Sequence, residues 1–118
     1  MSGRLAQFNQ PHTTMPDDWK PQWNIAPGKP LLILRKTAGQ LECASVLWNL
    51  TPGWLKDLSR ASFSARAEYL HEKPMFRQAF AQRRCILPVD GYFLWLQQGQ
   101  RKQPWYLRRK EGGLALAG

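Results

Sequence analysis

The chain has 118 residues, of which 43% are hydrophobic, a size and composition that suit one small domain with a modest core. Its 17 lysines and arginines against 8 aspartates and glutamates give a formal net charge of +9, which favours a polyanionic partner such as nucleic acid, with an incidentally basic surface as the alternative. The sequence has no apolar stretch near the ~20 residues of a membrane-spanning helix and no apolar segment behind a basic N-terminus, so we expect no membrane association, no secretory signal and a cytoplasmic location.

Apolar runs between Gly- and Pro-rich turns predict a strand-rich first half. Residues 31–36 are typical of a buried strand, which a turn at Gly39 joins to a second strand in a hairpin. Pro27 and Gly28 predict a turn before this hairpin, because Pro restricts φ and Gly permits a positive φ. The elements expected in chain order are a strand or extended arm at 3–9, a loop with at most one helical turn at 11–22, a turn at 23–28, strands at 31–36 and 41–50, and a turn at 51–54 with Trp54 at its tip.

The second half is predicted to hold a helix and four further strands. Pro74 suits the first turn of a helix, and apolar residues recur four positions apart after it. Arg83 and Arg84 would end this helix with a charge that suits its dipole. The expected elements are a loop at 55–66, a helix at 74–82, two strands within 85–97 that a turn at Asp90-Gly91 separates, and strands at 104–109 and 114–118 around Glu111-Gly112-Gly113.

The last residues, Leu114 to Gly118, are mostly apolar and lie inside the last expected strand. Natural domains seldom end in mid-strand without a polar tail, so we expect the chain to be one domain that is incomplete at its C-terminus, as the first part of a longer protein. A short protein whose last strand is an edge strand is the alternative.

The cysteines and histidines give no sign of a metal site. Cys43 and Cys85 form no CxxC motif and have no histidine at metal-ligand spacing. Both lie in apolar runs, so we expect buried free thiols in a reducing compartment, and neither a metal nor another cofactor. His12 and His71 have no evident carboxylate or cysteine partner, and we expect neither to be catalytic.

Rigid turns and arginines are the candidate nucleic-acid contacts. Pro27-Gly28 and Pro52-Gly53-Trp54 present apolar faces that can hold unstacked bases, with packing of Trp54 into the core as the alternative. Several arginines are candidates for a phosphate-binding groove, with a solvated charge as the alternative for each. These arginines are Arg4, Arg60, Arg66, Arg77, Arg83 and Arg84.

Ser2 is the candidate for covalent chemistry. A small second residue normally allows removal of Met1, which leaves a free α-amine on a residue with a β-hydroxyl. An α-amine has an ordinary pKa of about 7.7–8.0, so part of it is neutral at physiological pH and can capture an aldehyde. The alternative is that a small residue after Met1 has no role.

Six motifs stand in one order along the chain. They are Met1-x-Gly3-Arg4, Asn24-Ile25-Ala26-Pro27-Gly28, Trp48-x-Leu50-x-Pro52-Gly53-Trp54, Ala65-Arg66-Ala67-Glu68, Arg84-Cys85-Ile86-x-Pro88-x-Asp90-Gly91-Tyr92-Phe93-x-Trp95 and Lys102-Gln103-Pro104-Trp105-Tyr106. With them the chain resembles the SRAP family, the SOS response-associated peptidases or abasic-site processing proteins. The likeness covers the whole chain but only about the first half of a typical member, and it implies a mixed, strand-rich α+β fold with few short helices.

The resemblance implies an active site in which this chain departs from the family at three positions. The family has Cys at position 2, whose amine and thiol bond the aldehyde of an abasic site in single-stranded DNA, and this chain has Ser2. The family's Asn-Ala-Arg motif begins here with Ser64, and its acid–base Glu is replaced by Leu94. The family's active-site His lies beyond Gly118. Exchange of one Cys in an otherwise active member would explain Ser2 but neither of the other two departures.

The DNA-holding residues match the family better. The resemblance implies that Arg4 and Arg66 contact phosphates and that Pro27 and Trp54 contact bases at a bend in the DNA. The expected partner is therefore single-stranded or abasic DNA, with the protein at the nucleoid when DNA is bound.

Three hypotheses follow. The first is an SRAP-like protein of the DNA damage or SOS response that binds abasic single-stranded DNA, with cross-linking weakened or lost because an alcohol is a weaker nucleophile than a thiol and Leu94 cannot transfer a proton. The second is an active enzyme that uses the Ser2 amine for Schiff-base or lyase chemistry. The third is a non-enzymatic interaction domain with incidental charge. The peptidase activity in the family name finds no recognisable protease residues here.

Overall fold

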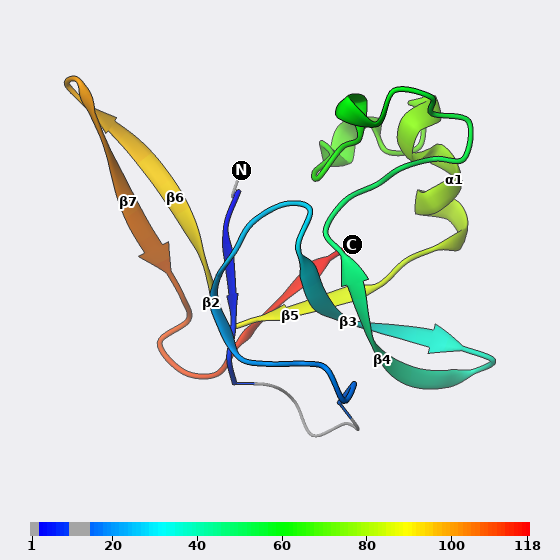
Figure 1. Ribbon diagram of the computed structural model, residues 1–118, viewed down its shortest axis with the longest axis horizontal. Helices are drawn as coiled ribbons and strands as arrows, with labels where there is room; N and C mark the ends of the chain where they lie inside the picture. The colour runs from blue at the N-terminus through cyan, green and yellow to red at the C-terminus, as the bar shows by residue number, and fades with distance from the viewer. Residues whose placement is uncertain (1–2, 10–14) are drawn as a thin grey trace.

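The computed structural model describes residues 3–9 and 15–118. Its strands form two four-stranded sheets in which every pairing is antiparallel (Figure 1). The first sheet has the order β2 (Gln22–Ile25), β1 (Leu5–Gln7), β6 (Gly91–Gln98) and β7 (Arg101–Leu107), and the second has the order β4 (Gln40–Leu47), β3 (Pro30–Thr37), β5 (Ile86–Val89) and β8 (Leu114–Ala117). The strand-rich α+β fold expected from the sequence is confirmed.

The expected turn at 23–28 is wrong in its first half. Residues Gln22–Ile25 form β2, because their backbone pairs with β1 across the register Leu5↔Ile25 and Gln7↔Gln22. The turn itself begins at Ala26, whose carbonyl accepts a hydrogen bond from the Lys29 N–H at 3.2 Å. The local Pro-Gly pattern predicts the position of the turn correctly. The end of β2 before this turn is instead set by pairing with β1, some fifteen residues earlier in the chain.

The last two strands of the chain lie in different sheets. β7 pairs with β6 along its whole length, from Tyr92↔Leu107 to Gln98↔Arg101, whereas β8 pairs with β5. The segment after β7 therefore crosses from the first sheet to the second, as the orange-to-red connection in Figure 1 shows. β7 also begins at Arg101 rather than at 104, so the β6–β7 hairpin is longer than the sequence predicted.

Buried residues of both sheets form the core. The core cluster consists of Leu5, Ile25, Leu31, Ile33 and Val89. The side chain of Gln7 is fully buried beside it and joins the sheets by hydrogen bonds. Its Nε2 donates to the carbonyl oxygens of Leu32 at 2.9 Å and Pro88 at 2.6 Å, and its Oε1 accepts the Leu32 N–H at 2.9 Å.

The expected helix at 74–82 is confirmed as α1 (Pro74–Gln82). Pro74 occupies the first turn, where a missing N–H costs no intrahelical hydrogen bond. Arg83 caps the C-terminus, and its N–H donates to the Ala79 carbonyl at 2.8 Å. Before α1, the loop expected at 55–66 contains one single-turn 3-10 helix, η1 (Leu58–Arg60), and a second, η2 (Ala67–Tyr69), follows directly after it.

Gly91 is the position in β6 where a side chain has no room. A Cβ there would overlap the ring of Tyr106, which lies across the glycine from β7. We expect Gly91→Ala to lower the free energy of unfolding by about 1–3 kcal/mol, because the ring must move to remove the overlap. Urea denaturation measures this loss. The matched control is Gly53→Ala, where no atom of the described residues lies within 4 Å of the added Cβ; equal stability of the two variants would contradict the prediction.

Cys43 and Cys85 are free thiols and both are half-buried. Burial raises the pKa of the Cys85 thiol, against a smaller opposite effect of the Arg84 and Arg35 charges. In the described part of the chain, no helix is long and apolar enough to span a membrane. Residues 3–9 and 15–118 contain no group of three or more His, Cys, Asp or Glu side chains placed to hold a metal ion.

Candidate nucleic-acid interface

Arg4 lies at the start of β1 and is tied to both neighbouring strands. The Phe93 N–H of β6 donates to the Arg4 carbonyl at 3.1 Å. The Arg4 guanidinium donates from Nη1 to Oδ1 of Asn24 in β2 at 3.2 Å. Asn24 was not singled out from the sequence, although it opens the motif that contains Pro27. The Asn24 side chain, three residues before Pro27, orients the Arg4 guanidinium.

The turn that carries Pro27 is held against the end of β4. The Gly28 N–H donates to the Trp48 carbonyl at 2.9 Å, and the Trp48 N–H donates to the Lys29 carbonyl at 3.0 Å. Gly28 has a positive φ of 84°, which a residue with a side chain rarely adopts. Pro27 is half-buried in this turn, so its position is set by the backbone on both sides.

Trp48 also anchors the segment that carries Trp54. Its indole Nε1 donates to the Phe63 carbonyl at 2.8 Å, and the two rings meet edge to face with centroids 5.9 Å apart. A bridge between Leu50 and Ser62, with N–O distances of 2.7 and 3.2 Å, closes the loop between them. Trp54 stands on this closed loop with 58% of its surface exposed, so the alternative of a core position for Trp54 is wrong.

Ser64 and Arg66 follow directly after this loop. The Ser62 hydroxyl donates to the Ser64 carbonyl at 2.7 Å, which fixes the backbone at Ser64. Arg66 is the residue before η2, where its carbonyl accepts the Tyr69 N–H at 3.1 Å. The Arg66 side chain is exposed. Within the described ranges, no carboxylate forms a salt bridge with it, which leaves its charge available for an anion.

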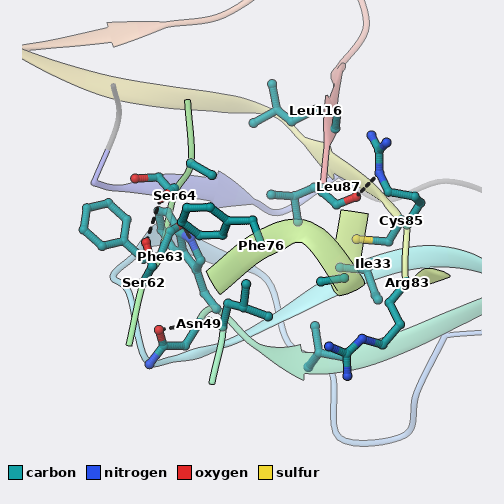
Figure 2. Close-up of a pocket in the computed structure, with 18 of the residues that line it drawn as sticks. Ile33, Asn49, Ser62, Phe63, Ser64, Phe76, Arg83, Cys85, Leu87 and Leu116 are labelled. Atoms are coloured by element: carbon teal, nitrogen blue, oxygen red, sulfur yellow. Dashed lines mark hydrogen bonds between the residues drawn. The ribbon is translucent and has the colours of Figure 1, made fainter. Parts of the chain in front are cut away.

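Ser64 lines a largely apolar cavity of about 510 Å³ between the second sheet, α1 and the segment from Trp48 to Ala65. Figure 2 shows Phe63 and Ser64 on one side of the cavity and Cys85 and Arg83 on the other. Leu5 of β1 lines the same cavity. Ser64 and the first residue of β1 therefore line one cavity.

Leu94 lies in β6 beside the start of β1. Leu5 pairs with Tyr92, and the Phe93 N–H donates to the Arg4 carbonyl, so Leu94 follows directly after the residue that contacts Arg4. Ser2 lies outside the described residues, so its position relative to Leu94 and Ser64 stays a prediction. Leu94 offers only a hydrocarbon side chain, one residue after the Phe93 N–H that contacts the Arg4 carbonyl.

The candidate residues therefore fall into connected groups. Asn24 links Arg4 to the strand before Pro27, and Trp48 links the turn of Pro27 to the segment of Trp54, Ser64 and Arg66. In Figure 1 the start of β1 lies between the β6–β7 hairpin on the left and the green segment before α1 on the upper right. Trp48 was visible in the sequence only as a motif residue, and its anchoring role required the structure.

Asp90 does more than form a turn. Its Oδ2 accepts the backbone N–H groups of Phe8 at 2.6 Å and Asn9 at 3.0 Å, and its own N–H donates to the Ala6 carbonyl at 2.8 Å. The carboxylate thus fixes the end of β1. The sequence showed only an Asp before a Gly, which is the ordinary signature of a turn.

The remaining candidate arginines are dispersed over the α1 side of the molecule. Arg60, Arg77, Arg83 and Arg84 are exposed, and none of them forms a salt bridge with a described carboxylate. Arg84 instead donates from Nε to the Gly118 carbonyl at 3.1 Å and lies over the Phe80 ring at 4.7 Å. Arg83 and Arg84 line the cavity that Ser64 also lines, whereas the described residues that line this cavity do not include Arg60 or Arg77.

The chain is similar in sequence to a known family and to known proteins. The family described as "SOS response associated peptidase (SRAP)" matches residues 2–118. The abasic site processing protein YoqW of Bacillus subtilis is 31% identical over 118 residues, which are 97% of this chain and 53% of that protein. The abasic site processing protein YedK of Escherichia coli is 32% identical over 91 residues, 77% of this chain and 40% of that protein.

Solved structures agree with the fold. A phage-related protein from Bordetella bronchiseptica superposes with a TM-score of 0.78 at 22% identity, over 98% of this chain and 58% of that one. A protein from Bacteroides thetaiotaomicron superposes with a TM-score of 0.69 at 27% identity, over 85% of this chain and 46% of that one. The chain spans about half the length of the relatives it matches.

Proposed function

This chain belongs to the SOS response associated peptidase (SRAP) family, and from that premise we propose that it binds single-stranded DNA at abasic sites with little or no stable cross-linking. The proposal is supported by the names of relatives such as YoqW, an abasic site processing protein. One observation carries it for this chain: exposed Trp54 and Arg66 stand on a loop segment that Trp48 ties to the turn of Pro27.

The arrangement suits single-stranded DNA chemically. The exposed Trp54 ring can stack on any unpaired base, because every base has a π-face. Arg66 and Arg4 each present a guanidinium, which can hold a phosphate by two parallel hydrogen bonds. The net charge of +9 attracts the strand at long range and makes binding salt-dependent.

The covalent step is where the chain differs from the family. An abasic site carries an aldehyde, which the α-amine of Ser2 can attack to form a Schiff base with loss of water. Ring closure by the β-hydroxyl would be poor, because an alcohol at neutral pH is a weaker nucleophile than a thiol. Leu94 cannot donate or accept the protons that the step requires. We therefore propose retention of the lesion by binding, with any Schiff base remaining reversible.

Trp54→Ala and Arg66→Ala are each expected to weaken binding of an abasic single-stranded oligonucleotide about ten-fold. The first loses a stacked base, worth roughly 1–3 kcal/mol, and the second loses a phosphate contact and lowers the salt slope by about one unit. Fluorescence anisotropy titrations at several salt concentrations measure both effects.

The matched controls lie on the β3–β4 hairpin, which projects away from this segment in Figure 1. Leu41 is 57% exposed, nearly the same exposed fraction as Trp54 has. Lys36 is an exposed cation like Arg66. Leu41→Ala and Lys36→Ala should leave affinity within about two-fold, the range of an ordinary surface change. If the controls and the interface variants weaken binding equally, the charge acts without a defined interface and the proposal fails.

A further inference from the structure

We propose that one face of the β6–β7 hairpin extends the DNA path beyond Arg4, as a platform on which further bases of the single strand stack. We call this surface the hairpin face and define it by Phe93, Trp95, Pro104 and Tyr106. The inference rests on the proposed function, because it adds a second binding segment to the same DNA interface.

The register of the hairpin places these four residues on one side of the sheet. Phe93 pairs with Tyr106 and Trp95 pairs with Pro104, and directly paired residues of antiparallel strands point to the same face. The ring centroids of Phe93 and Trp95 lie 6.2 Å apart, and those of Phe93 and Tyr106 lie 5.0 Å apart. The result is a continuous aromatic surface.

This surface is open to an incoming ligand. Trp95 is 44% exposed and Tyr106 is 39% exposed, although both are large apolar residues in strands. The overlap that a Cβ at Gly91 would make with the Tyr106 ring shows that Tyr106 lies against the sheet backbone. A ring that lies down on a sheet presents its outer side to the solvent, which is the geometry that base stacking needs.

The hairpin face is continuous with the interface at Arg4. Leu5 pairs with Tyr92, and the Phe93 N–H donates to the Arg4 carbonyl, so Arg4 lies beside Phe93. Because alternate residues of a strand point to opposite faces, the Arg4 side chain emerges on the side of Phe93 and Trp95. A strand held by Arg4 therefore meets the aromatic surface next.

Charge argues for a nucleic acid as the occupant rather than another protein. Residues 91–110 include five lysines and arginines and no aspartate or glutamate. Arg101 and Lys102 stand at the exposed tip of the hairpin, and Arg108 to Lys110 stand at its base. Aromatic rings between clusters of cations match the alternating bases and phosphates of a single strand.

The hairpin supplies its own control residue on the opposite face. Trp105 is 52% exposed and pairs with Leu94, so it points away from the hairpin face. Trp95→Ala and Trp105→Ala therefore remove the same side chain from the same hairpin, one from each side. Trp95→Phe keeps an aromatic ring at the tested position.

The experiment measures binding of abasic single strands of about 6 and about 16 nucleotides, which span the site sizes of single-strand binding folds. Trp95→Ala should weaken binding of the long strand about ten-fold and leave the short strand nearly unchanged. Trp105→Ala and Trp95→Phe should bind both strands like the parent. Circular dichroism should show the parent melting temperature for each variant that is compared.

Three results would overturn the inference, and each is distinguishable from failure of the proposed function. Parent-like binding of Trp95→Ala while Trp54→Ala still weakens binding would remove the platform and leave the interface intact. Equal losses for Trp95→Ala and Trp105→Ala would show that the two faces are not distinct. A change of oligomeric state in sedimentation, without a change in DNA affinity, would assign the face to contacts between copies of this chain.

Discussion

Ser2→Cys is expected to convert the protein into one that cross-links abasic single-stranded DNA stably. A thiol has an ordinary pKa of about 8.5, so a few per cent is thiolate at pH 7, whereas an alcohol supplies essentially none. The α-amine is the same in both proteins, so only closure of the ring on the Schiff base changes. We expect at least a roughly ten-fold gain of adduct that survives denaturing electrophoresis without reductant.

The control variants distinguish the contribution of the α-amine to adduct formation from that of the residue-2 side chain. Ser2→Ala keeps the α-amine without a hydroxyl, and borohydride should trap it as well as it traps the parent. Intact mass must show removal of Met1 in each variant, because a retained Met1 displaces the amine. Adding Leu94→Glu to Ser2→Cys should raise the rate further, since a carboxyl group can transfer the protons that Leu94 cannot.

Absence of a stable adduct in the Ser2→Cys protein would contradict the view that the weak nucleophile limits the chemistry. Stable cross-links formed by the parent protein without reductant would contradict the proposal of reversible retention. Borohydride-dependent trapping of the parent is compatible with a transient Schiff base, and it would exclude binding that never reaches the covalent stage.

Gln7→Leu is expected to lower the free energy of unfolding by at least about 3 kcal/mol. The Leu side chain cannot replace the amide, so the Leu32 N–H loses its acceptor and the carbonyls of Leu32 and Pro88 lose a donor. Each buried polar group left without a partner costs roughly 1–3 kcal/mol. Since these groups belong to β3 and β5 while Gln7 belongs to β1, the loss weakens the junction of the two sheets.

Urea denaturation followed by tryptophan fluorescence measures the loss. Gln98→Leu is the matched control, because Gln98 is exposed at the end of β6, and its change should stay within about 0.5 kcal/mol. A destabilisation below about 1 kcal/mol in Gln7→Leu would show that water or local rearrangement satisfies the three groups. The central role of Gln7 would then be wrong.

Local signals predicted the elements whose causes are local. The helix at 74–82 was found at its observed bounds, because Pro74 marks its start and apolar spacing marks its length. The hairpin of β3 and β4 was found because an apolar run and Gly39, with its positive φ, specify the turn. In each case the deciding residues lie within a few positions of one another.

The failures involve partners that are distant in sequence. The sequence predicts a turn in place of β2, because its partner, β1, lies some fifteen residues earlier in the chain. The sequence predicts Asp90 only as a turn residue and assigns Gln7 no role, because their hydrogen bonds join residues about 25 to 82 positions apart. The sequence is compatible with a core or a surface position for Trp54, and its 58% exposure establishes the surface position.

The sequence by itself determined the family, the basic charge and the residue identities at Ser2, Ser64 and Leu94, because motifs and residue identities are read directly from the chain. The tertiary structure alone decided that Trp48 joins two candidate segments and that Leu94 lies beside the start of β1. It also decided that Phe93, Trp95 and Tyr106 lie together on one face of the β6–β7 hairpin, with the Phe93 backbone beside Arg4. Strand register between distant segments sets these relations, and local periodicity carries no information about that register.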